Sequence, residues 1–582
     1  MSSSHALTPR QVADRHVDAV ADLDPLLGTF LGIRPGIDTL PDFSPAGLAA
    51  FADLRRATLA ELDAAEAAAD AAKAAADAAK AAADAAEAAA DTGSTLPDVE
   101  RRAARLLRER LEAELAVHES GDDLRDLNTF FSPLHLVRLA FTQMPKDTDD
   151  DWAVLGRRLR RVPESLRSYR EALAEGATRG LHAAPRQVAA VVEQLDAWVG
   201  DDWFGGLVAD APGPLRAELQ AAAAQARAAY ADARAYLADT YAPSAAGTPD
   251  AVGRERYARW ARHWTGSEVD LEQAYAYGWD EYHRLVGEIT VAAHAILPGS
   301  SPKAVMRHLD HHGEAVEGVE EVRLWLQRLM DETMADLDGV HVDLADPVRR
   351  VESMIAPAGS AAAGYYTRPS LDFARPGRTW FPTLGHTRFP TWSLVSTWYH
   401  EGVPGHHLQL AQWVHVADTL SRYQVSLGSV SASTEGWALY AERLMDELGN
   451  LTDPGRRLGY LDSSLLRAIR VIIDIGMHLE LPIPDHSDFR PGETWTPESA
   501  REFVATRSGL EPDYVDSEIV RYLGIPGQAI SYKLGERAWL AGREAARAAR
   551  GGEFDLKTWH MAALSMGSLG LDDLTDELAR LS

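Results

Sequence analysis

The sequence predicts a mostly α-helical protein with one small β-sheet. Three observations lead to this fold class: an alanine-rich repeat over residues 61–91, amphipathic segments around it, and a stretch rich in Pro, Gly and paired aromatic residues that begins near residue 352. Alanine has the highest helix propensity, whereas frequent Pro and Gly beside aromatic pairs are typical of short strands and turns. A helical pattern resumes at Thr391 and continues through most of the remaining chain.

The alanine-rich repeat carries an aspartate at every seventh position: Asp63, Asp70, Asp77, Asp84 and Asp91. We expect a long, largely exposed helix that packs as a hairpin against the next helix, because alanine gives only a weak coiled-coil seam. A partner-binding arm is the alternative. The next segment, residues 98–117, is amphipathic, with four leucines on one face. For the whole chain we expect a helical lobe over residues 1–350 and a catalytic region over residues 351–582, joined as one continuous unit.

The bulk composition excludes several classes of function. The 582 residues carry a formal net charge of −29, which disfavours nucleic acid as a partner because phosphates would be repelled. The chain has no cysteine, so disulfides, thiolate metal sites and cysteine nucleophiles are absent. Residues 1–20 lack the apolar core of a secretory signal, and no stretch reaches ~18 consecutive apolar residues. We therefore expect a cytoplasmic protein without a membrane span; its oligomeric state stays open.

The stretch WYHEGVPGHHLQ, residues 398–409, resembles a zinc-protease helix that has been interrupted. In the signature H-E-x-x-H, two histidines four residues apart share one helix face and one ion. Here Pro404 stands where the second histidine belongs. His406 would lie about 240° round a regular helix from His400, and His407 about 10.5 Å along its axis. Neither position suits a shared ion.

Pro404 itself offers a solution to this geometry. A proline inside a helix clashes with the carbonyl four residues earlier and donates no hydrogen bond, and the adjacent Gly405 relaxes the backbone further. We expect the helix to bulge or break over residues 403–405; two residues looped out would bring His406 to the position of the second ligand. His400 and His406 would then bind the metal, with Glu401 as the general base for water at the metal. His407 remains the alternative ligand.

A third ligand is expected on a second helix, in SVSASTEGWALYAERLMDELG from Ser429. Glu435 lies in the expected first turn of that helix, and a glutamate 25–35 residues beyond the histidines is typical of zinc peptidases with a glutamate ligand. Glu442, seven residues later, is the reserve ligand or a residue that supports one. The metal is expected to be one Zn²⁺ per chain, although His and Glu ligands suit several divalent ions.

With these motifs the chain resembles the bacterial family DUF885, which is similar to the gluzincin peptidases, including thimet-type oligopeptidases and angiotensin-converting enzyme. The resembling elements, in family order, are RPG at 375–377, YHEGVPGHHLQ, TEGWALYAE at 434–442, RVIIDIGMH at 470–478 and RYLGIPGQAISYKLG at 521–535. The resemblance implies a large helical metallopeptidase-like fold with a deep cleft and a small sheet along one wall. It also implies His400, His406 and Glu435 as ligands and Glu401 as base.

Further residues receive roles from their chemistry. Asp474 and His478 share a helix face; Asp474 would orient a ligand histidine, and His478 would donate to the developing oxyanion. Tyr532 resembles the tyrosine that oligopeptidases direct at the oxyanion. A substrate carboxylate would be held by three candidate cations: Arg375, Arg521 and Lys533. Each residue has a structural alternative, as a buried bracing pair, a core tyrosine or a surface ion pair.

The sequence thus predicts a zinc-dependent peptidase that acts on short peptides. The strand-like residues 365–381 would offer an edge with which an extended peptide can pair. Two alternatives remain: hydrolysis of a non-peptide amide or specialised metabolite at the same site, and a non-enzymatic interaction protein with a structural or vestigial metal site.

Overall fold

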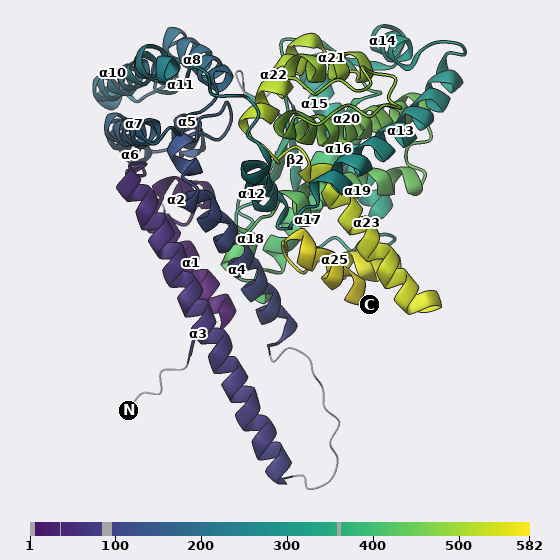
Figure 1. The fold of residues 1–582 in the computed structure, drawn as a ribbon, viewed down its shortest axis with the longest axis horizontal. Helices are drawn as coiled ribbons and strands as arrows, with labels where there is room; N and C mark the ends of the chain where they lie inside the picture. Colours follow the sequence, from purple (N-terminus) through teal and green to yellow (C-terminus); the bar gives the residue numbers. More distant parts are fainter. Residues whose placement is uncertain (1–5, 35, 84–95, 358–362, 582) are drawn as a thin grey trace. The chain divides into compact units, whose positions relative to one another are not determined.

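A computed structural model of the chain describes residues 6–34, 36–83, 96–357 and 363–581. Its described elements are mostly helices (Figure 1), which confirms the predicted fold class. The chain divides into two compact units, Met1–Val252 with Leu523–Ile525, and Gly253–Tyr522 with Pro526–Ser582. This boundary differs from the expected one near residue 350, because the change of composition there marks the strands inside the second unit.

The first unit is built from helices alone over its described residues. Its core combines aliphatic side chains with aromatic rings such as Phe141, Phe204 and Tyr230. The helices are α1 (Pro9–Leu23), α2 (Pro25–Leu31), α3 (Pro45–Ala83), α4 (Asp98–Glu119), α5 (Pro133–Gln143), α6 (Asp149–Leu159), α7 (Val162–Thr178), α8 (Pro185–Gly200), α9 (Trp203–Leu207), α10 (Gly213–Tyr236) and α11 (Ala242–Ala245).

The alanine-rich repeat belongs to the long helix α3, which packs against α1 and α4. Arg108 of α4 pairs with Asp63 at 2.7 Å and with Glu66 at 2.6 Å, so the expected packing against the next helix is confirmed for this part. The four leucines of residues 98–117 are buried on one face of α4, as predicted. Asp84 and Asp91, and with them the end of the repeat, lie outside the described residues.

The second unit contains the predicted catalytic residues. Pairs of long helices pack side by side in it, α13 with α20 and α19 with α23 (Figure 1). Its helices are α12 (Arg254–Thr265), α13 (Leu271–Ile296), α14 (Pro302–His312), α15 (Val319–Leu337), α16 (Leu394–Glu401), α17 (His406–His415), α18 (Arg422–Val425), α19 (Ser431–Glu447), α20 (Pro454–Leu479), α21 (Pro497–Arg507), α22 (Pro512–Gly524, whose last two residues are grouped with the first unit), α23 (Ser531–Arg550), α24 (Leu556–Leu564) and α25 (Leu571–Arg580).

The strands of the second unit form two small sheets, whereas the sequence predicts one. Four strands lie in the segment where short strands are predicted, but β1 (Ala315–Glu317) precedes that segment and was not predicted. In the three-stranded sheet, β4 (Gly377–Phe381) lies between β2 (Val351–Ile355), parallel to it, and β3 (Tyr365–Thr367), antiparallel to it. In the other sheet, β1 pairs antiparallel with β5 (Arg388–Pro390). Strand β3 is therefore an edge strand, and the segment that follows the sheets leads directly into α16.

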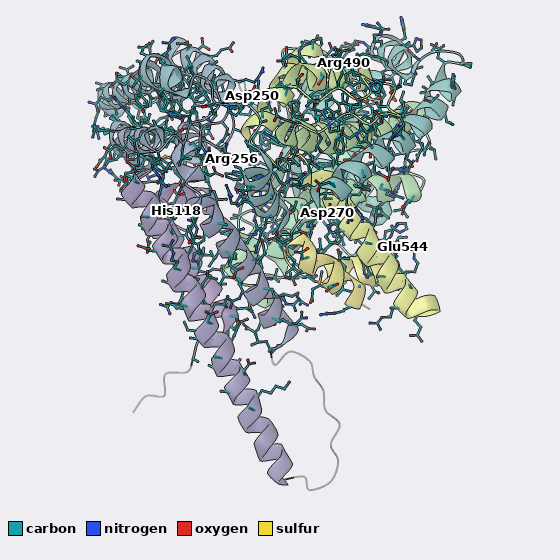
Figure 2. The ribbon with its side chains drawn as sticks, in the orientation of Figure 1. His118, Asp250, Arg256, Asp270, Arg490 and Glu544 are labelled. Atoms are coloured by element: carbon teal, nitrogen blue, oxygen red, sulfur yellow. The ribbon has the colours of Figure 1, made fainter. Side chains whose placement is uncertain are left out.

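Charged side chains lie on the outer helix faces, as the acidic composition requires. Figure 2 labels examples, among them Asp270, which caps the N-terminus of α13, and Glu544 on α23. Within the residues that the structure describes, no helix has the length and apolar character needed to cross a membrane.

Candidate metal centre

The candidate metal-binding motif is split between two helices, as Pro404 predicts. Helix α16 ends at Glu401 and α17 begins at His406, so His400 and His406 belong to different helices. The backbone N–H of Gly402 closes the last turn of α16 on the carbonyl of Trp398 at 2.9 Å. The peptide bond between Val403 and Pro404 is cis. The helix is therefore interrupted at the expected residues.

The turn between the two helices is held from α19. The indole N–H of Trp437 donates to the carbonyls of Pro404, at 2.9 Å, and of Gly405, at 3.1 Å. These carbonyls are buried, and a buried carbonyl without a donor is costly. Gly405 is required here, because a Cβ at this position would lie 2.0 Å from the carbonyl oxygen of His400. The tryptophan thereby fixes the turn that places His406.

The turn brings together three side chains with metal-ligating atoms. His400 Nε2 lies 3.3 Å and His406 Nε2 lies 3.5 Å from Glu435 Oε2. The three ligand atoms all lie within 4.8 Å of one another. Four ligands at ~2.1 Å in a tetrahedron are separated by ~3.4 Å. The two measured distances agree with this value, and Glu435 Oε2 is a buried oxygen without a hydrogen-bond donor among the described residues.

His407 points away from this group and makes hydrogen bonds elsewhere. Its Nδ1 lies 3.0 Å from the hydroxyl of Tyr366 on β3, and its Nε2 lies 2.6 Å from the carbonyl oxygen of Val348. Burial lowers the pKa of the imidazole to about 4, so it stays neutral. Both ring nitrogens are thus used structurally, and the geometry favours His406 over His407 as the ligand.

Glu442 supports His400 from behind. Its Oε1 lies 2.8 Å from His400 Nδ1, and its other oxygen accepts a hydrogen bond from the Ser396 hydroxyl. An outer carboxylate of this kind fixes the orientation of a ligating imidazole and leaves Nε2 for the metal. Burial disfavours the imidazolium, but contacts with Glu435 and Glu442 outweigh it and raise the pKa of His400 to about 9. A metal ion at Nε2 would displace this proton.

Glu401, the predicted general base, is buried beside the three candidate ligands. No described residue forms a hydrogen bond with its carboxylate. Burial raises the pKa of this carboxyl group, and the negative charge of Glu435 raises it further, whereas His400 and His406 lower it. A raised pKa and an unengaged carboxylate suit a group that accepts a proton during catalysis.

Tyr532 is brought toward the centre by close contact between α19 and α23. A Cβ on Gly436 would lie 2.3 Å from the backbone carbonyl carbon of Gly535, so only glycine allows the two helices to touch. Burial and the charge of the nearby Glu435 raise the pKa of Tyr532, which keeps its hydroxyl protonated. The guanidinium carbon of Arg470 lies 4.9 Å from the centre of the Tyr532 ring.

Asp474 and His478 share a face of α20, as predicted, but their hydrogen bonds go to other residues than a ligand histidine. Asp474 Oδ2 accepts hydrogen bonds from the hydroxyl of Tyr257, at 2.7 Å, and from the backbone N–H of Gly527, at 3.0 Å. His478 Nε2 lies 3.1 Å from the carbonyl oxygen of Tyr522. Burial raises the pKa of Asp474 to about 7. The pair braces the segment before Tyr532, and the expected support of a ligand histidine comes from Glu442 instead.

The three predicted substrate-binding cations have different environments. Lys533 is fully buried; its Nζ contacts Glu536 at 2.6 Å and Ser464 at 2.9 Å, which favours a structural role. Arg521 forms a two-pronged pair with Glu518 and also donates to Gln528 at 2.7 Å. Arg375 is half-buried, and no described residue provides it with an acidic partner.

Sequence reasoning missed several residues that shape the centre. Trp437 holds the turn at Pro404, and Tyr366 holds the ring of His407. In the sequence, only their proximity to the motifs could have indicated these roles. Arg467 lies one turn before Arg470 on α20, and its charge lowers the pKa of Glu401 and Glu442. A sequence signal did exist for it, because positions 467, 470 and 474 recur at helical spacing on one face.

Comparisons with known proteins identify relatives of the whole chain. The family model described as "Bacterial protein of unknown function (DUF885)" matches residues 66–578. None of the curated proteins matches. Among solved structures, the chain is similar to "the putative lipoprotein from Colwellia psychrerythraea", with a TM-score of 0.79 and 22% identity over 98% of both chains. It is also similar to "a putative lipoprotein of unknown function from Shewanella oneidensis", with a TM-score of 0.70 and 18% identity over 98% of this chain and 100% of that chain.

These similarities correct one expectation. The predicted cytoplasmic location is contradicted, because both structural neighbours are described as a "putative lipoprotein". The lack of an apolar stretch in residues 1–20 is therefore not sufficient to assign a location. At these identities the structural likeness otherwise shows the fold alone.

Proposed function

We propose that this chain, which belongs to the bacterial family of unknown function DUF885, hydrolyses peptide bonds of short peptides with the help of one zinc ion. The observation that carries the proposal is the spacing of His400 Nε2 and His406 Nε2 from Glu435 Oε2, 3.3 and 3.5 Å, which is close to the ~3.4 Å between neighbouring ligands of tetrahedral zinc. Catalytic zinc sites have three protein ligands and an open fourth position. The proposed relationship to gluzincin peptidases rests on this ligand set.

The donor set suits zinc better than calcium or magnesium. Two imidazole nitrogens and one carboxylate oxygen are typical zinc ligands, whereas calcium and magnesium prefer oxygen ligands throughout. Glu435 Oε2 is buried and accepts no hydrogen bond from the described residues, and a bound cation would satisfy it. When bound, zinc supplies Lewis acidity that polarises a peptide carbonyl and makes water more acidic.

The protein's own groups then move the protons. Glu401 accepts a proton from the water molecule whose oxygen attacks the peptide carbonyl carbon. Tyr532, a neutral donor, stabilises the negative charge that develops on the carbonyl oxygen. The proton held by Glu401 is passed to the amide nitrogen as the C–N bond breaks, which leaves a carboxylic acid and an amine. Glu401 then carries the remaining proton of the water from the new carboxyl group to the amine, so the products are a carboxylate and an ammonium group. Glu401 ends the cycle ionised and ready for the next water.

The first test measures metal content and cleavage in the same preparations. We expect about one zinc per chain in the wild type by mass spectrometry, and its loss in H406A. E401Q should keep the zinc but lose cleavage of a defined library of N-acetylated tetrapeptides. A wild-type protein that takes up no zinc, or an E401Q protein as active as the wild type, would contradict the proposal. Zinc uptake with every peptide intact would favour a non-peptide amide as substrate.

A further inference from the structure

Two half-buried arginines, Arg368 and Arg375, lack the acidic partners that neighbouring arginines have. On the same small sheets, Arg378 pairs with Glu352 at 2.8 Å, and other cations are neutralised in the same way. No carboxylate among the described residues pairs with Arg368 or Arg375. Burial lowers the pKa of both guanidinium groups, since a buried charge without a partner is unfavourable. An anionic ligand would compensate for this burial.

The edge strand β3 connects these arginines to the catalytic base. Gly364 directly precedes β3, and a Cβ at this residue would lie 3.8 Å from Glu401 Cγ. Two residues later, the hydroxyl of Tyr366 contacts His407 Nδ1 on α17. Alternate residues of a strand face the same side, so Arg368 faces the same side as Gly364 and Tyr366. Its guanidinium group donates a hydrogen bond to the carbonyl of Val425. The strand therefore runs along the metal-binding helices, from Glu401 toward Arg368.

The turn between β3 and β4 brings Arg375 to the end of β3 at which Arg368 lies. Tyr366 pairs with Thr379 across the two strands, and Gly377 begins β4 just after Arg375. A Cβ on Gly377 would lie 2.6 Å from the hydroxyl oxygen of Tyr366, so β4 passes directly over this hydroxyl. Burial raises the pKa of Tyr366, while the charges of Arg368 and Arg375 both lower it. Both guanidinium groups are therefore close enough to Tyr366 to act electrostatically on its hydroxyl.

We propose that Arg368 and Arg375 form a binding site for a carboxylate of the substrate. The inference rests on the proposed peptidase function and specifies its substrates as peptides with a negative charge near the cleaved bond. A strand rises ~3.3 Å per residue, so Arg368 lies ~13 Å along the chain from Gly364. An extended peptide covers this length with about four residues, which places the charged group at that distance from the reacting carbonyl.

The charge of the protein makes such a site necessary for an anionic peptide. The chain has a net charge of −29, and Glu401, Glu435 and Glu442 surround the reaction centre. An acidic peptide is repelled by this field unless local cations oppose it. Arginine also grips a carboxylate with two parallel hydrogen bonds, which fixes the position of the peptide as well as its charge. The carboxylate belongs either to the C-terminus of the peptide or to an acidic side chain.

Peptide pairs that differ by one carboxylate test the site and identify its source. The probes are N-acetyl-tetraalanine as free acid and as amide, and amidated tetrapeptides with Glu or Gln at each position in turn. Binding is measured by calorimetry on zinc-loaded E401Q, and cleavage by the wild type is measured as kcat/KM. We expect one kind of carboxylate to improve both quantities by about ten- to a hundredfold, the usual contribution of a charged hydrogen-bonded pair. The free-acid pair responds if the C-terminus is bound, and the Glu/Gln pairs respond if a side chain is bound.

Matched arginine variants locate the effect. R375Q should abolish the preference in both assays, whereas R378Q, next to it and already neutralised by Glu352, should retain it. R368Q is the second variant. If Arg368, the more buried of the two arginines, is needed for folding, R375Q alone decides the test. Equal binding and cleavage of acidic and neutral peptides would overturn the inference, and so would a preference that R375Q leaves intact. Cleavage in either case would still support the proposed peptidase function. Peptides that are neither bound nor cleaved would overturn both proposals.

Discussion

Replacement of Glu442 by glutamine tests the metal centre through a residue that is not itself a ligand. Glu442 contacts His400 Nδ1 at 2.8 Å and accepts a hydrogen bond from Ser396. Glutamine has the same shape, and its carbonyl oxygen and amide nitrogen can keep both contacts. E442Q therefore removes one buried negative charge and changes little else. A loss of zinc affinity would then report electrostatic support of His400.

The magnitude depends on pH because zinc and protons compete for His400. Carboxylates behind a ligating histidine change metal affinity about 10- to 100-fold, which corresponds to roughly 1.4–2.7 kcal/mol. The same charge helps to raise the pKa of His400, so near neutral pH zinc must displace a proton. E442Q weakens this competition, and the two effects oppose each other at pH 7. The full 10- to 100-fold loss is expected near pH 9, with a smaller loss at pH 7.

Zinc titration against a competing chelator at pH 7, 8 and 9 measures both effects. Wild-type affinity should rise with pH up to the pKa of His400, and the rise should end at a lower pH in E442Q. E536Q is the matched control, because Glu536 is also a buried carboxylate but pairs with Lys533. It should leave the zinc affinity unchanged. Equal affinities of E442Q and wild type at pH 9 would refute the reasoning.

Three further outcomes are expected. By mass spectrometry, H406A should lose its zinc and H407A should keep it. H407A should instead lower the free energy of unfolding by roughly 2–4 kcal/mol, because His407 is buried and hydrogen-bonded. G436A places a Cβ 2.3 Å from the backbone of Gly535, so we expect a lower Tm and a loss of about 100-fold in kcat/KM; wild-type activity would contradict this. Acidification from pH 6.5 toward 4 should lower stability in chemical denaturation, because buried histidines stay neutral in the fold while the unfolded chain takes up protons in this range. Burial lowers the pKa of five histidines to about 4: His16, His135, His407, His478 and His560.

Local patterns were sufficient to predict the elements that carry the site. Helices such as α4 follow from apolar spacing, and the break between His400 and His406 follows from the chemistry of Pro404 alone. The position of Glu435 near the histidines was predicted from its distance along the chain. These features depend on contacts within one or two helical turns, or on a motif whose residue spacing determines its local structure.

Contacts between distant segments could not be predicted in the same way. The indole of Trp437 reaches the turn at Pro404 from another helix, and Tyr366 takes His407 away from the metal through a strand 41 residues earlier. The boundary between the two units also lies where no change of composition marks it. Such pairings depend on how elements pack in three dimensions, which periodicity does not encode.

The backbone contact between α19 and α23 has a consequence for the evolution of this chain. Where two helices touch through Gly436 and Gly535, no side chain between them can be enlarged or trimmed to adjust their spacing. The separation of Glu435 from Tyr532 can thus be changed only by a substitution that shifts a whole helix. Divergence in substrate preference would then accumulate in the β3–β4 hairpin, where single arginines can be gained or lost without moving the helices.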